Sequence, residues 1–259
     1  MPTIIPIPAF TDNYIWLLRD GHNAVVVDPG DAAPVLAVLA REQLQLTAIL
    51  TTHHHQDHVG GNTALLAHAS VPVFGPARET IPGRTHPLKE NDTFIVPGIG
   101  IELRVLDIPG HTAGHIAYVG PLGANGQAAF VGDTMFACGC GRLFEGTAAQ
   151  MSDSLAKLAA LDGDTLVYCG HEYTLSNLRF AAVVEPDNAA LKARTLRAQE
   201  QRSRGEPTVP SMLAEELATN PFLRGGEPAV IAAAAAHAGR AIEGKVDAFA
   251  VLRAWKDRF

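Results

Sequence analysis

Residues 52–58 read Thr-His-His-His-Gln-Asp-His and place four candidate metal ligands, His53, His55, Asp57 and His58, within six positions. Residues two apart in an extended segment project to the same side, so His53 and His55 can bind one cation. Asp57 and His58 follow them, where they can begin a second site. Imidazole suits zinc and iron, and an adjacent carboxylate suits a hard divalent ion. The segment therefore predicts two neighbouring metal positions.

Three further candidate ligands occur downstream, each beside a glycine and after an apolar run: His111, Asp133 and His171. A histidine-rich stretch alone could be a purification tag or ordinary surface polarity. Its combination with the downstream residues favours a dinuclear metal site instead. His115 follows His111 by four positions and is interpreted as structural, and His54 shows no partner pattern.

The composition sets limits on the class of protein. The 259 residues can form one large domain or a main domain with an appendix. Hydrophobic residues make up 47% and charged residues 18%, which is typical of a globular protein with a substantial core. The net charge of -7 argues against nucleic-acid binding, which needs a basic face. An anionic substrate would need a local basic patch.

Membrane and secretion signals are not expected in this sequence. Apolar runs fall short of the ~20 residues of a membrane span, and residues 1–8 lack a basic start and contain prolines, unlike a signal peptide. The three cysteines, Cys138, Cys140 and Cys169, are an odd number, which indicates a reducing compartment. We therefore expect free, packed thiols and a cytoplasmic protein without membrane contacts.

The first two-thirds of the chain alternates short β-branched runs with turns and helices. Residues 24–30 predict a buried strand ending in a turn, and residues 31–41 predict a helix with Asp31 as its N-cap. Residues 46–50 predict another strand that ends at the histidine-rich segment. Because every proposed ligand follows a strand, the side chains can converge at one sheet edge. Hairpin spacings mixed with helical crossovers predict mixed sheets.

After about residue 170 the pattern becomes helical, with prolines between helices and no predicted strand. We expect a catalytic domain at residues 1–169 and a small helical domain at residues 170–259. The predicted helices cover residues 175–184, 189–204, 211–218, 229–237 and 247–255.

The ligand pattern, His-x-His-x-Asp-His followed by Gly-His, Gly-Asp and a final Gly-His, resembles the metallo-β-lactamase superfamily. The resemblance implies an α+β fold, a four-layer αββα sandwich with the metals at one edge of two sheets, here followed by the small all-helical domain. It also implies a division of ligands: His53, His55 and His111 on one metal, Asp57, His58 and His171 on the other, and Asp133 bridging both.

Five further segments are similar to the glyoxalase II family of that superfamily: residues 10–16, 139–147, 170–174, 220–224 and 252–259. This resemblance implies that residues 170–259 bind glutathione at the seam between the two domains. Without it, two basic residues three apart on a terminal helix would be interpreted as a solvated face.

The substrate contacts are carried over from the same resemblance. Arg142 and Tyr173 would contact the glutathione moiety, and Arg253 with Lys256 would bind its glycine carboxylate. Phe144 stands where some relatives carry tyrosine, so a hydroxyl contact is expected to be lost there.

The implied reaction is hydrolysis of the thioester S-D-lactoylglutathione, an S-(2-hydroxyacyl)glutathione, to glutathione and D-lactate in the second step of methylglyoxal detoxification. Two divalent ions, zinc first with iron or manganese as alternatives, would lower the pKa of a bridging water from ~15.7 towards ~7. The resulting hydroxide would attack the carbonyl carbon. Asp57 and Asp133 would be catalytic, Asp57 as a ligand that also orients the hydroxide. A thiol with a pKa of about 8.5 leaves without a strong general acid.

Three other functions compete with this hypothesis. A glutathione persulfide dioxygenase of the same superfamily would use a single iron, and the helical region ending in Arg253 and Lys256 argues against it. The acidic net charge argues against a nuclease, and the full ligand set argues against a non-catalytic metal-binding protein. Metal stoichiometry would separate hydrolase from dioxygenase. A monomer is expected, because the basic patch lies within one chain.

Overall fold

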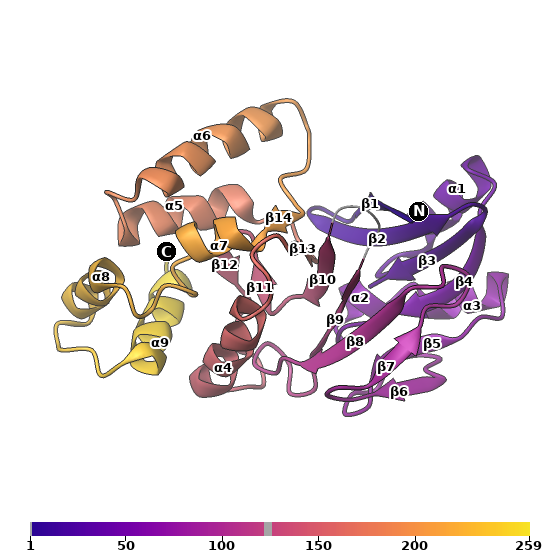
Figure 1. Cartoon of the computed structure of the whole chain (residues 1–259), viewed down its shortest axis with the longest axis horizontal. Coiled ribbons are helices and arrows are strands. Elements are labelled where there is room, and N and C mark those ends of the chain that lie inside the picture. Colours follow the sequence, from indigo (N-terminus) through magenta and orange to yellow (C-terminus); the bar gives the residue numbers. More distant parts are fainter. Residues whose placement is uncertain (1, 122–125) are drawn as a thin grey trace.

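The computed structural model describes residues 2–121 and 126–259 and contains two six-stranded sheets packed face to face (Figure 1). The first sheet has the order β1 (Thr3–Ala9), β2 (Asn13–Asp20), β3 (Asn23–Val27), β4 (Gln45–Leu50), β5 (Val73–Pro76) and β6 (His86–Leu88). The second has the order β14 (Ser211–Met212), β13 (Leu166–Cys169), β10 (Gln127–Gly132), β9 (Ile116–Pro121), β8 (Glu102–Asp107) and β7 (Thr93–Ile95). A short ribbon pairs β11 (Met135–Phe136) with β12 (Gly139–Cys140).

Both large sheets are mixed, as the sequence predicts. In the first, β1, β2 and β3 pair antiparallel, and β3 to β6 pair parallel. In the second, β7 to β10 pair antiparallel, β10 and β13 pair parallel, and β13 and β14 pair antiparallel. The parallel pairs require crossovers, and helices supply several of them.

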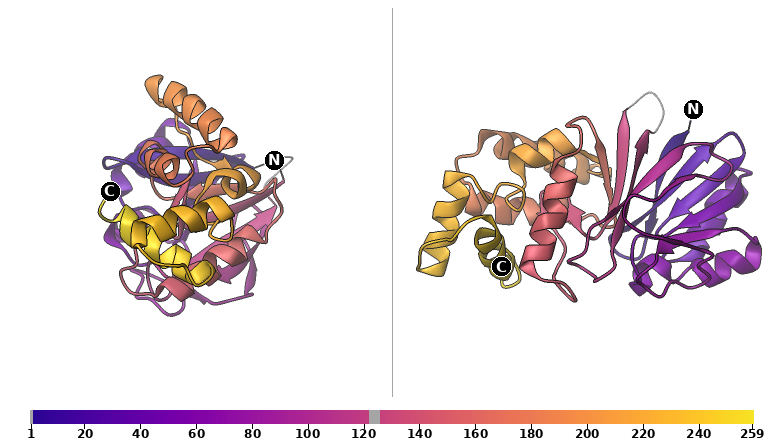
Figure 2. Two further views of the ribbon diagram at one scale, coloured as in Figure 1. Left: turned by 90° about the vertical axis from the view of Figure 1, so that its left-hand side faces the viewer. Right: turned by 60° about the horizontal axis from the view of Figure 1, so that its bottom comes forward.

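Helices cover the outer faces of the two sheets and complete four αββα layers (Figures 1 and 2). On the first sheet these are α1 (Ala32–Arg41), α2 (Gln56–Val59) and α3 (Asn62–His68). Beyond the second sheet lie α4 (Ala148–Ala159) and the C-terminal helices α5 (Thr174–Val184), α6 (Ala189–Ser203), α7 (Leu213–Thr219), α8 (Pro228–Ala238) and α9 (Lys245–Lys256). The expected superfamily sandwich with a helical C-terminal region is confirmed.

Strand β2 shows why the first sheet is apolar on both faces. Its side chains alternate, so Trp16 and Leu18 join the core between the sheets, whereas Ile15 and Leu17 join a second core under α1 and α3. A strand covered on both faces has no solvent side, and β2 is accordingly buried along most of its length.

Local signals account for several helix starts. Asp31 caps α1 as predicted, its side chain accepting the backbone N–H of Ala33 at 2.9 Å. Helix α4 was not predicted, although Thr147 and Gln150 form a capping box at its start. The five helices expected after residue 170 are present with small shifts in their ends.

One prediction about the C-terminal region is wrong. Ser211 and Met212 form β14, whereas no strand was predicted after residue 170. They pair with Val167 and Leu166 at the edge of the second sheet. The edge strand β13 offers unpaired backbone groups, and the returning chain satisfies them there.

The two sheets are joined at the edge where the candidate ligands gather. The backbone N–H of Tyr14 donates to Gly170 O at 2.8 Å, and that of Glu172 donates to Asp12 O at 2.8 Å. The cysteines are buried free thiols, as predicted. Across residues 2–121 and 126–259, none of the helices has the length and apolar character needed to cross a membrane.

Candidate active site

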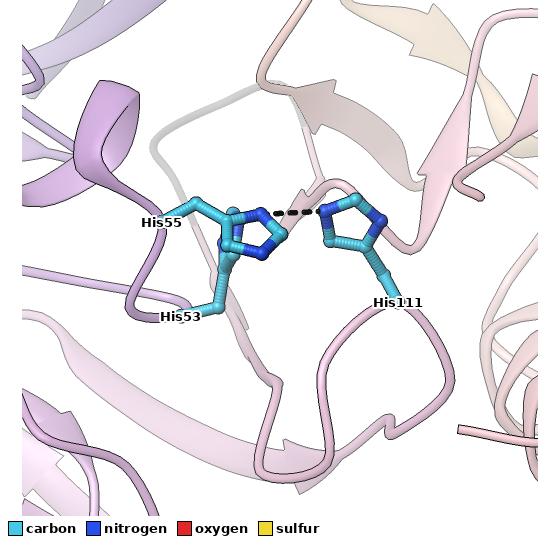
Figure 3. Close-up of side chains that lie close together, drawn as sticks. All are labelled: His53, His55 and His111. Atoms are coloured by element: carbon cyan, nitrogen blue, oxygen red, sulfur yellow. Dashed lines mark hydrogen bonds between the residues drawn. The ribbon is translucent and has the colours of Figure 1, made fainter. Parts of the chain in front are cut away.

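Three histidines from two loops form the first ligand trio, His53, His55 and His111 (Figure 3). His53 and His55 follow β4, and His111 lies in the loop between β8 and β9. His55 Nδ1 and His111 Nε2 face each other at 3.0 Å, and ring nitrogens of all three residues lie within 4.8 Å of one another. His53 is fully buried, so the trio lies at the base of the site.

The second ligand trio is Asp57, His58 and His171. Asp57 and His58 lie on α2, and His171 follows β13. His58 Nε2 and His171 Nε2 are 3.4 Å apart, and Asp57 Oδ2 lies 3.6 Å and 3.4 Å from these two nitrogens. Residues more than a hundred positions apart in the chain thus face a common point.

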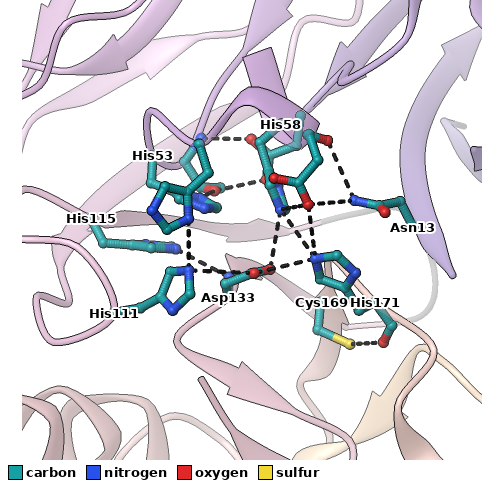
Figure 4. A network of polar contacts seen from close by, with 12 residues as sticks. Asn13, His53, His58, His111, His115, Asp133, Cys169 and His171 are labelled. Carbon is teal, nitrogen blue, oxygen red and sulfur yellow. Dashed lines mark hydrogen bonds and ion pairs between the residues drawn. The ribbon is translucent and has the colours of Figure 1, made fainter. Parts of the chain in front are cut away.

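Asp133 lies between the two trios, in the turn after β10 (Figure 4). Its Oδ1 is 3.3 Å from His58 Nε2, and its Oδ2 is 3.2 Å from His171 Nε2 and 3.5 Å from His111 Nε2. The carboxylate therefore contacts members of both groups.

The donor atoms fit divalent cations. His53 Nε2 and Asp133 Oδ1 are buried and have no hydrogen bond among the described residues. Ligand atoms bonded at ~2.0–2.1 Å to a tetrahedral zinc lie about 3.3 Å apart. The contacts of 3.0–3.6 Å between opposing nitrogens and oxygens match that spacing. Two imidazole lone pairs facing each other are better satisfied by a shared cation than by one proton.

The outer nitrogens of three histidines are held by acceptors that turn their Nε2 atoms inward. His58 Nδ1 lies 3.2 Å from Asp28 Oδ2, and His171 Nδ1 lies 2.8 Å from Asp12 Oδ1. His111 Nδ1 donates to the backbone carbonyl of Arg142 at 2.9 Å. These contacts fix the ring orientations before any ligand arrives.

Sequence reasoning missed the roles of Asp12, Asn13 and Asp28. Asn13 Nδ2 donates to Asp57 Oδ2 at 3.1 Å and so orients that carboxylate. Asp28 also accepts from the backbone N–H and hydroxyl of Thr52, both at 2.7 Å. A signal existed: each of these polar residues stands beside a strand end, in segments already noted for other reasons.

The carboxylates control where protons reside in this site. Burial alone lowers the pKa of His58, but Asp133 and Asp28 raise it well above its usual value. His171 is subject to the same two effects: burial lowers its pKa, but Asp133 raises it more strongly, to about 10. Burial raises the pKa of Asp133, yet His58 and His171 lower it well below its usual range. Cation binding to these nitrogens must therefore release protons.

Two glycines allow the close approach of the ligand loops. Gly132 has φ +47, and a Cβ there would lie 2.2 Å from Thr52 Oγ1 and 2.8 Å from the His115 ring. At Gly170 a Cβ would lie 2.5 Å from His58 Cε1. His115 Nε2 accepts the backbone N–H of Asp133 at 3.1 Å, the supporting position expected for it.

A cavity of about 830 Å³ opens from the ligand residues toward the C-terminal helices. It is lined by members of both trios and by the five side chains expected to contact substrate, namely Arg142, Phe144, Tyr173, Arg253 and Lys256. The structure thus brings most of the sequence-predicted residues together around one space, whereas the buried His53 and His58 do not line it. Arg179 and Asp257 are wall residues that the sequence did not single out.

The cavity wall combines aromatic and cationic side chains. Tyr173 stacks on His171 at 4.7 Å, and the exposed Phe144 packs edgewise on His111 at 5.3 Å. Arg253 is buried, donates to Cys140 O at 2.8 Å, and keeps a buried Nε without a hydrogen bond among the described residues. A buried, partly unsatisfied guanidinium beside a cavity suits an anionic ligand.

Comparison with known proteins agrees with this arrangement. Residues 9–171 match the family model described as Metallo-beta-lactamase superfamily, and residues 172–259 match Hydroxyacylglutathione hydrolase C-terminus. A hydroxyacylglutathione hydrolase of Alkalilimnicola ehrlichii is 60% identical over 260 residues, and one of Cupriavidus taiwanensis is 57% identical over 266 residues, each covering 100% of both chains. The chain belongs to the hydroxyacylglutathione hydrolase family. The superfamily fold implies divalent metal binding in this family member.

Solved structures share the fold. The crystal structure of ETHE1 from Myxococcus xanthus aligns with a TM-score of 0.66 at 24% identity, covering 97% of this chain and 89% of that one. The structure of TTHA1623 in a di-iron-bound form aligns with a TM-score of 0.53 at 30% identity, covering 65% and 91%. The superfamily model and these solved structures therefore agree on the fold of this hydroxyacylglutathione hydrolase family member.

Proposed function

We propose that this protein is a hydroxyacylglutathione hydrolase that hydrolyses S-D-lactoylglutathione, and related 2-hydroxyacyl thioesters, to glutathione and the 2-hydroxy acid, D-lactate in the first case. Relatives of that name at 51–60% identity support the assignment along the full chain. The observation that carries it is one cavity whose base is a double set of metal ligands and whose wall holds Arg253 and Lys256.

We assign two divalent ions to the ligand groups, zinc first, with iron or manganese as alternatives that suit the same nitrogen and oxygen donors. The first trio would hold one ion, the second trio the other, and Asp133 would bridge them. When bound, the ions supply a water molecule of lowered pKa and polarise the thioester carbonyl. Asn13 holds Asp57 through Oδ2. The second carboxylate oxygen, Oδ1, is then placed to orient the attacking water through its lone pairs.

The remaining side chains would bind and orient the thioester. Arg253 and Lys256 would take the glycine carboxylate, since both line the cavity and Arg253 Nε has no hydrogen-bond partner within residues 2–121 and 126–259. Tyr173 and Arg142 would contact the peptide portion, and Phe144 would shield the carbonyl from bulk water with its ring on the first trio. The thiolate leaves without protonation, because a thiol pKa of about 8.5 is low enough.

We further propose a division into a catalytic domain of residues 1–169 and a glutathione-binding domain of residues 170–259, because six of the seven ligand residues precede that boundary and His171 lies just past it. The chain would act as a cytoplasmic monomer without nucleic-acid or membrane partners. The three free cysteines support a reducing compartment. The basic residues and the ligands line one cavity of a single chain, so a monomer is adequate for the proposed site. A single-iron persulfide dioxygenase is not favoured by the relatives.

The test is hydrolysis of S-D-lactoylglutathione by metal-replete protein, followed through loss of thioester absorbance. A parallel sample carries Arg253→Ala and Lys256→Ala. We expect rapid turnover in the wild type and a KM raised by about 10-fold or more in the double variant, since each charge-assisted hydrogen bond contributes about 1.5–3 kcal/mol.

The number of metal ions per chain distinguishes the hydrolase from the dioxygenase where turnover alone does not. Two ions per chain with turnover support the hydrolase. Two ions without turnover would overturn the substrate and leave the metal site. One iron per chain, with oxygen consumption on glutathione persulfide, would support the dioxygenase instead.

A further inference from the structure

Glu79 is a buried carboxylate that contacts both loops of the first ligand trio. Its side chain is 3% exposed. One oxygen, Oε1, accepts from the Thr112 hydroxyl and from the backbone N–H of Gly114 at 2.9 Å. The other, Oε2, lies 2.9 Å from His54 Nδ1. Glu79 belongs to neither trio and does not line the cavity, although it forms a separate group with His54 and Glu145 whose possible ligand atoms lie within 4.8 Å of one another.

The partners of Glu79 are sequence neighbours of the trio. His54 stands between His53 and His55, and Thr112 directly follows His111. A peptide unit is planar and leaves two soft dihedrals per residue, so fixing one residue strongly limits the directions its neighbours can take. Holding His54 and Thr112 on one carboxylate therefore fixes the distance between the two loops that supply the trio.

The carboxylate is itself held in place. The guanidinium of Arg84 donates to the backbone carbonyls of Glu79 and Pro76. A Cβ at position 114 would lie 2.6 Å from Glu79 Cγ, so the glycine there gives the side chain room to reach the loop. Backbone and side chain of Glu79 are thus both positioned by the protein.

A second carboxylate completes the link from the exposed side. Glu145 Oε1 lies 3.2 Å from His54 Nε2, and its Oε2 accepts the backbone N–H of Ala113 at 2.8 Å. Its side chain is 37% exposed, so water competes for these contacts and they contribute less than those of Glu79. His54 is therefore held between two carboxylates that both bind the loop of His111.

We propose that Glu79 is a positioning residue for the first ligand trio, linking the His53–His55 loop to the His111 loop through His54, Thr112 and Gly114. The inference rests on the proposed function in one respect, that the trio holds a metal. The second trio takes its outer contacts from Asp12, Asn13 and Asp28 and does not contact Glu79. Loss of Glu79 must then weaken one metal position and spare the other.

The experiment titrates metal-free protein with Zn²⁺ against a competing chelator. Glu79→Gln is compared with wild type in two backgrounds, His171→Ala, which leaves the first trio, and His55→Ala, which leaves the second. We expect Glu79→Gln to lower the Zn²⁺ affinity by about 10–100-fold in the His171→Ala background, the usual effect of losing an outer partner of the ligands. In the His55→Ala background we expect Glu79→Gln to leave the Zn²⁺ affinity unchanged.

A matched control separates this effect from general damage to a carboxylate site. Glu90 also accepts a backbone N–H, that of Asp107, and belongs to no candidate ligand group. Glu90→Gln should leave both Zn²⁺ affinities unchanged. If Glu79→Gln does not fold, Thr112→Val removes one donor from the same carboxylate, and we expect a smaller loss at the first trio alone. Thermal unfolding of each metal-free variant reports on folding.

Two results would overturn the inference: unchanged Zn²⁺ affinity of Glu79→Gln in the His171→Ala background, or equal losses in both backgrounds. Failure of the proposed function would be seen in the wild-type protein, which would then bind fewer than two Zn²⁺ ions or leave the thioester intact. The two failures therefore cannot be confused.

Discussion

At the scale of single residues, charge compensation governs this site. Asp133 is buried among imidazoles from both trios, and its two oxygens face the Nε2 atoms of His58, His171 and His111. Its carboxylate lowers the electrostatic cost of gathering positive charge, whether that charge is a proton or a cation.

We predict that Asp133→Asn lowers hydrolysis by about 100-fold or more, because losing a ligand costs at least as much as losing an outer partner. Metal analysis after gel filtration should find fewer ions per chain, and a circular dichroism spectrum should show retained secondary structure. Full metal content with normal turnover would contradict the bridging position.

Lys256 predicts a pH dependence of substrate binding. Burial, with Arg253 nearby, lowers the pKa of Lys256 to about 8. The charged form is the acid form, so attraction for a carboxylate is present below pH 8 and is lost as the pH rises through that value. At pH 9 only about a tenth of the free enzyme would carry this charge, and kcat/KM should fall accordingly.

Lys256→Arg provides the control, because arginine stays charged over this range. Its kcat/KM should lack the decline between pH 7 and 9 that the wild type shows. The same decline in both proteins would assign it to another group.

At the scale of elements, the ends of strands and helices decide where the ligands stand. Helix α4 begins at the capping box of Thr147 and Gln150, and its Met151 packs against the loop of His111 at Gly110. A Cβ at Gly110 would lie 2.7 Å from Met151 Cβ. The cap of this helix therefore supports the loop of a ligand, although it does not contact the ligand.

We predict that Thr147→Ala lowers the free energy of unfolding by about 1 kcal/mol, the usual effect of losing a hydroxyl N-cap. Thr147→Ser keeps the hydroxyl and should behave like wild type. Urea unfolding followed by circular dichroism measures both. Equal stability of the alanine and wild-type proteins would show that the capping box contributes nothing measurable.

At the scale of the whole molecule, a buried ion pair ties helices α6 and α7 to the ribbon of β11 and β12. Glu216 on α7 is fully buried, accepts the backbone N–H of Cys138 at 2.8 Å and pairs with Arg194 on α6. Cys138 lies between β11 and β12, just before the segment that carries Arg142. The pair therefore connects helix packing to the cavity wall.

We predict that Arg194→Ala lowers the free energy of unfolding by about 3–5 kcal/mol, because it leaves a buried carboxylate without its charge partner. The double variant Arg194→Leu with Glu216→Gln should recover part of that loss. Urea unfolding of both variants measures the difference. If Arg194→Ala were as stable as wild type, water would have to reach the Glu216 carboxylate once the guanidinium is removed.

The sequence alone was sufficient for features that local chemistry dictates. Helix periodicity and proline spacing predicted α5 to α9, and Asp31 predicted the start of α1. The spacing of His53, His55, Asp57 and His58 indicated a metal site, since residue types and short spacings already express ligand chemistry. The family resemblance supplied the fold and the substrate class.

Contacts between distant segments were decided by the tertiary structure. Asp12 meets His171 across 159 positions, and Glu79 meets His54 across 25, with no short-range pattern to announce either. Strand β14 forms because the chain returns to an open sheet edge, and its two residues carry no strong strand signal of their own. A short-range pattern reflects the preferences of neighbouring residues, whereas these partners are chosen by the path of the backbone between them.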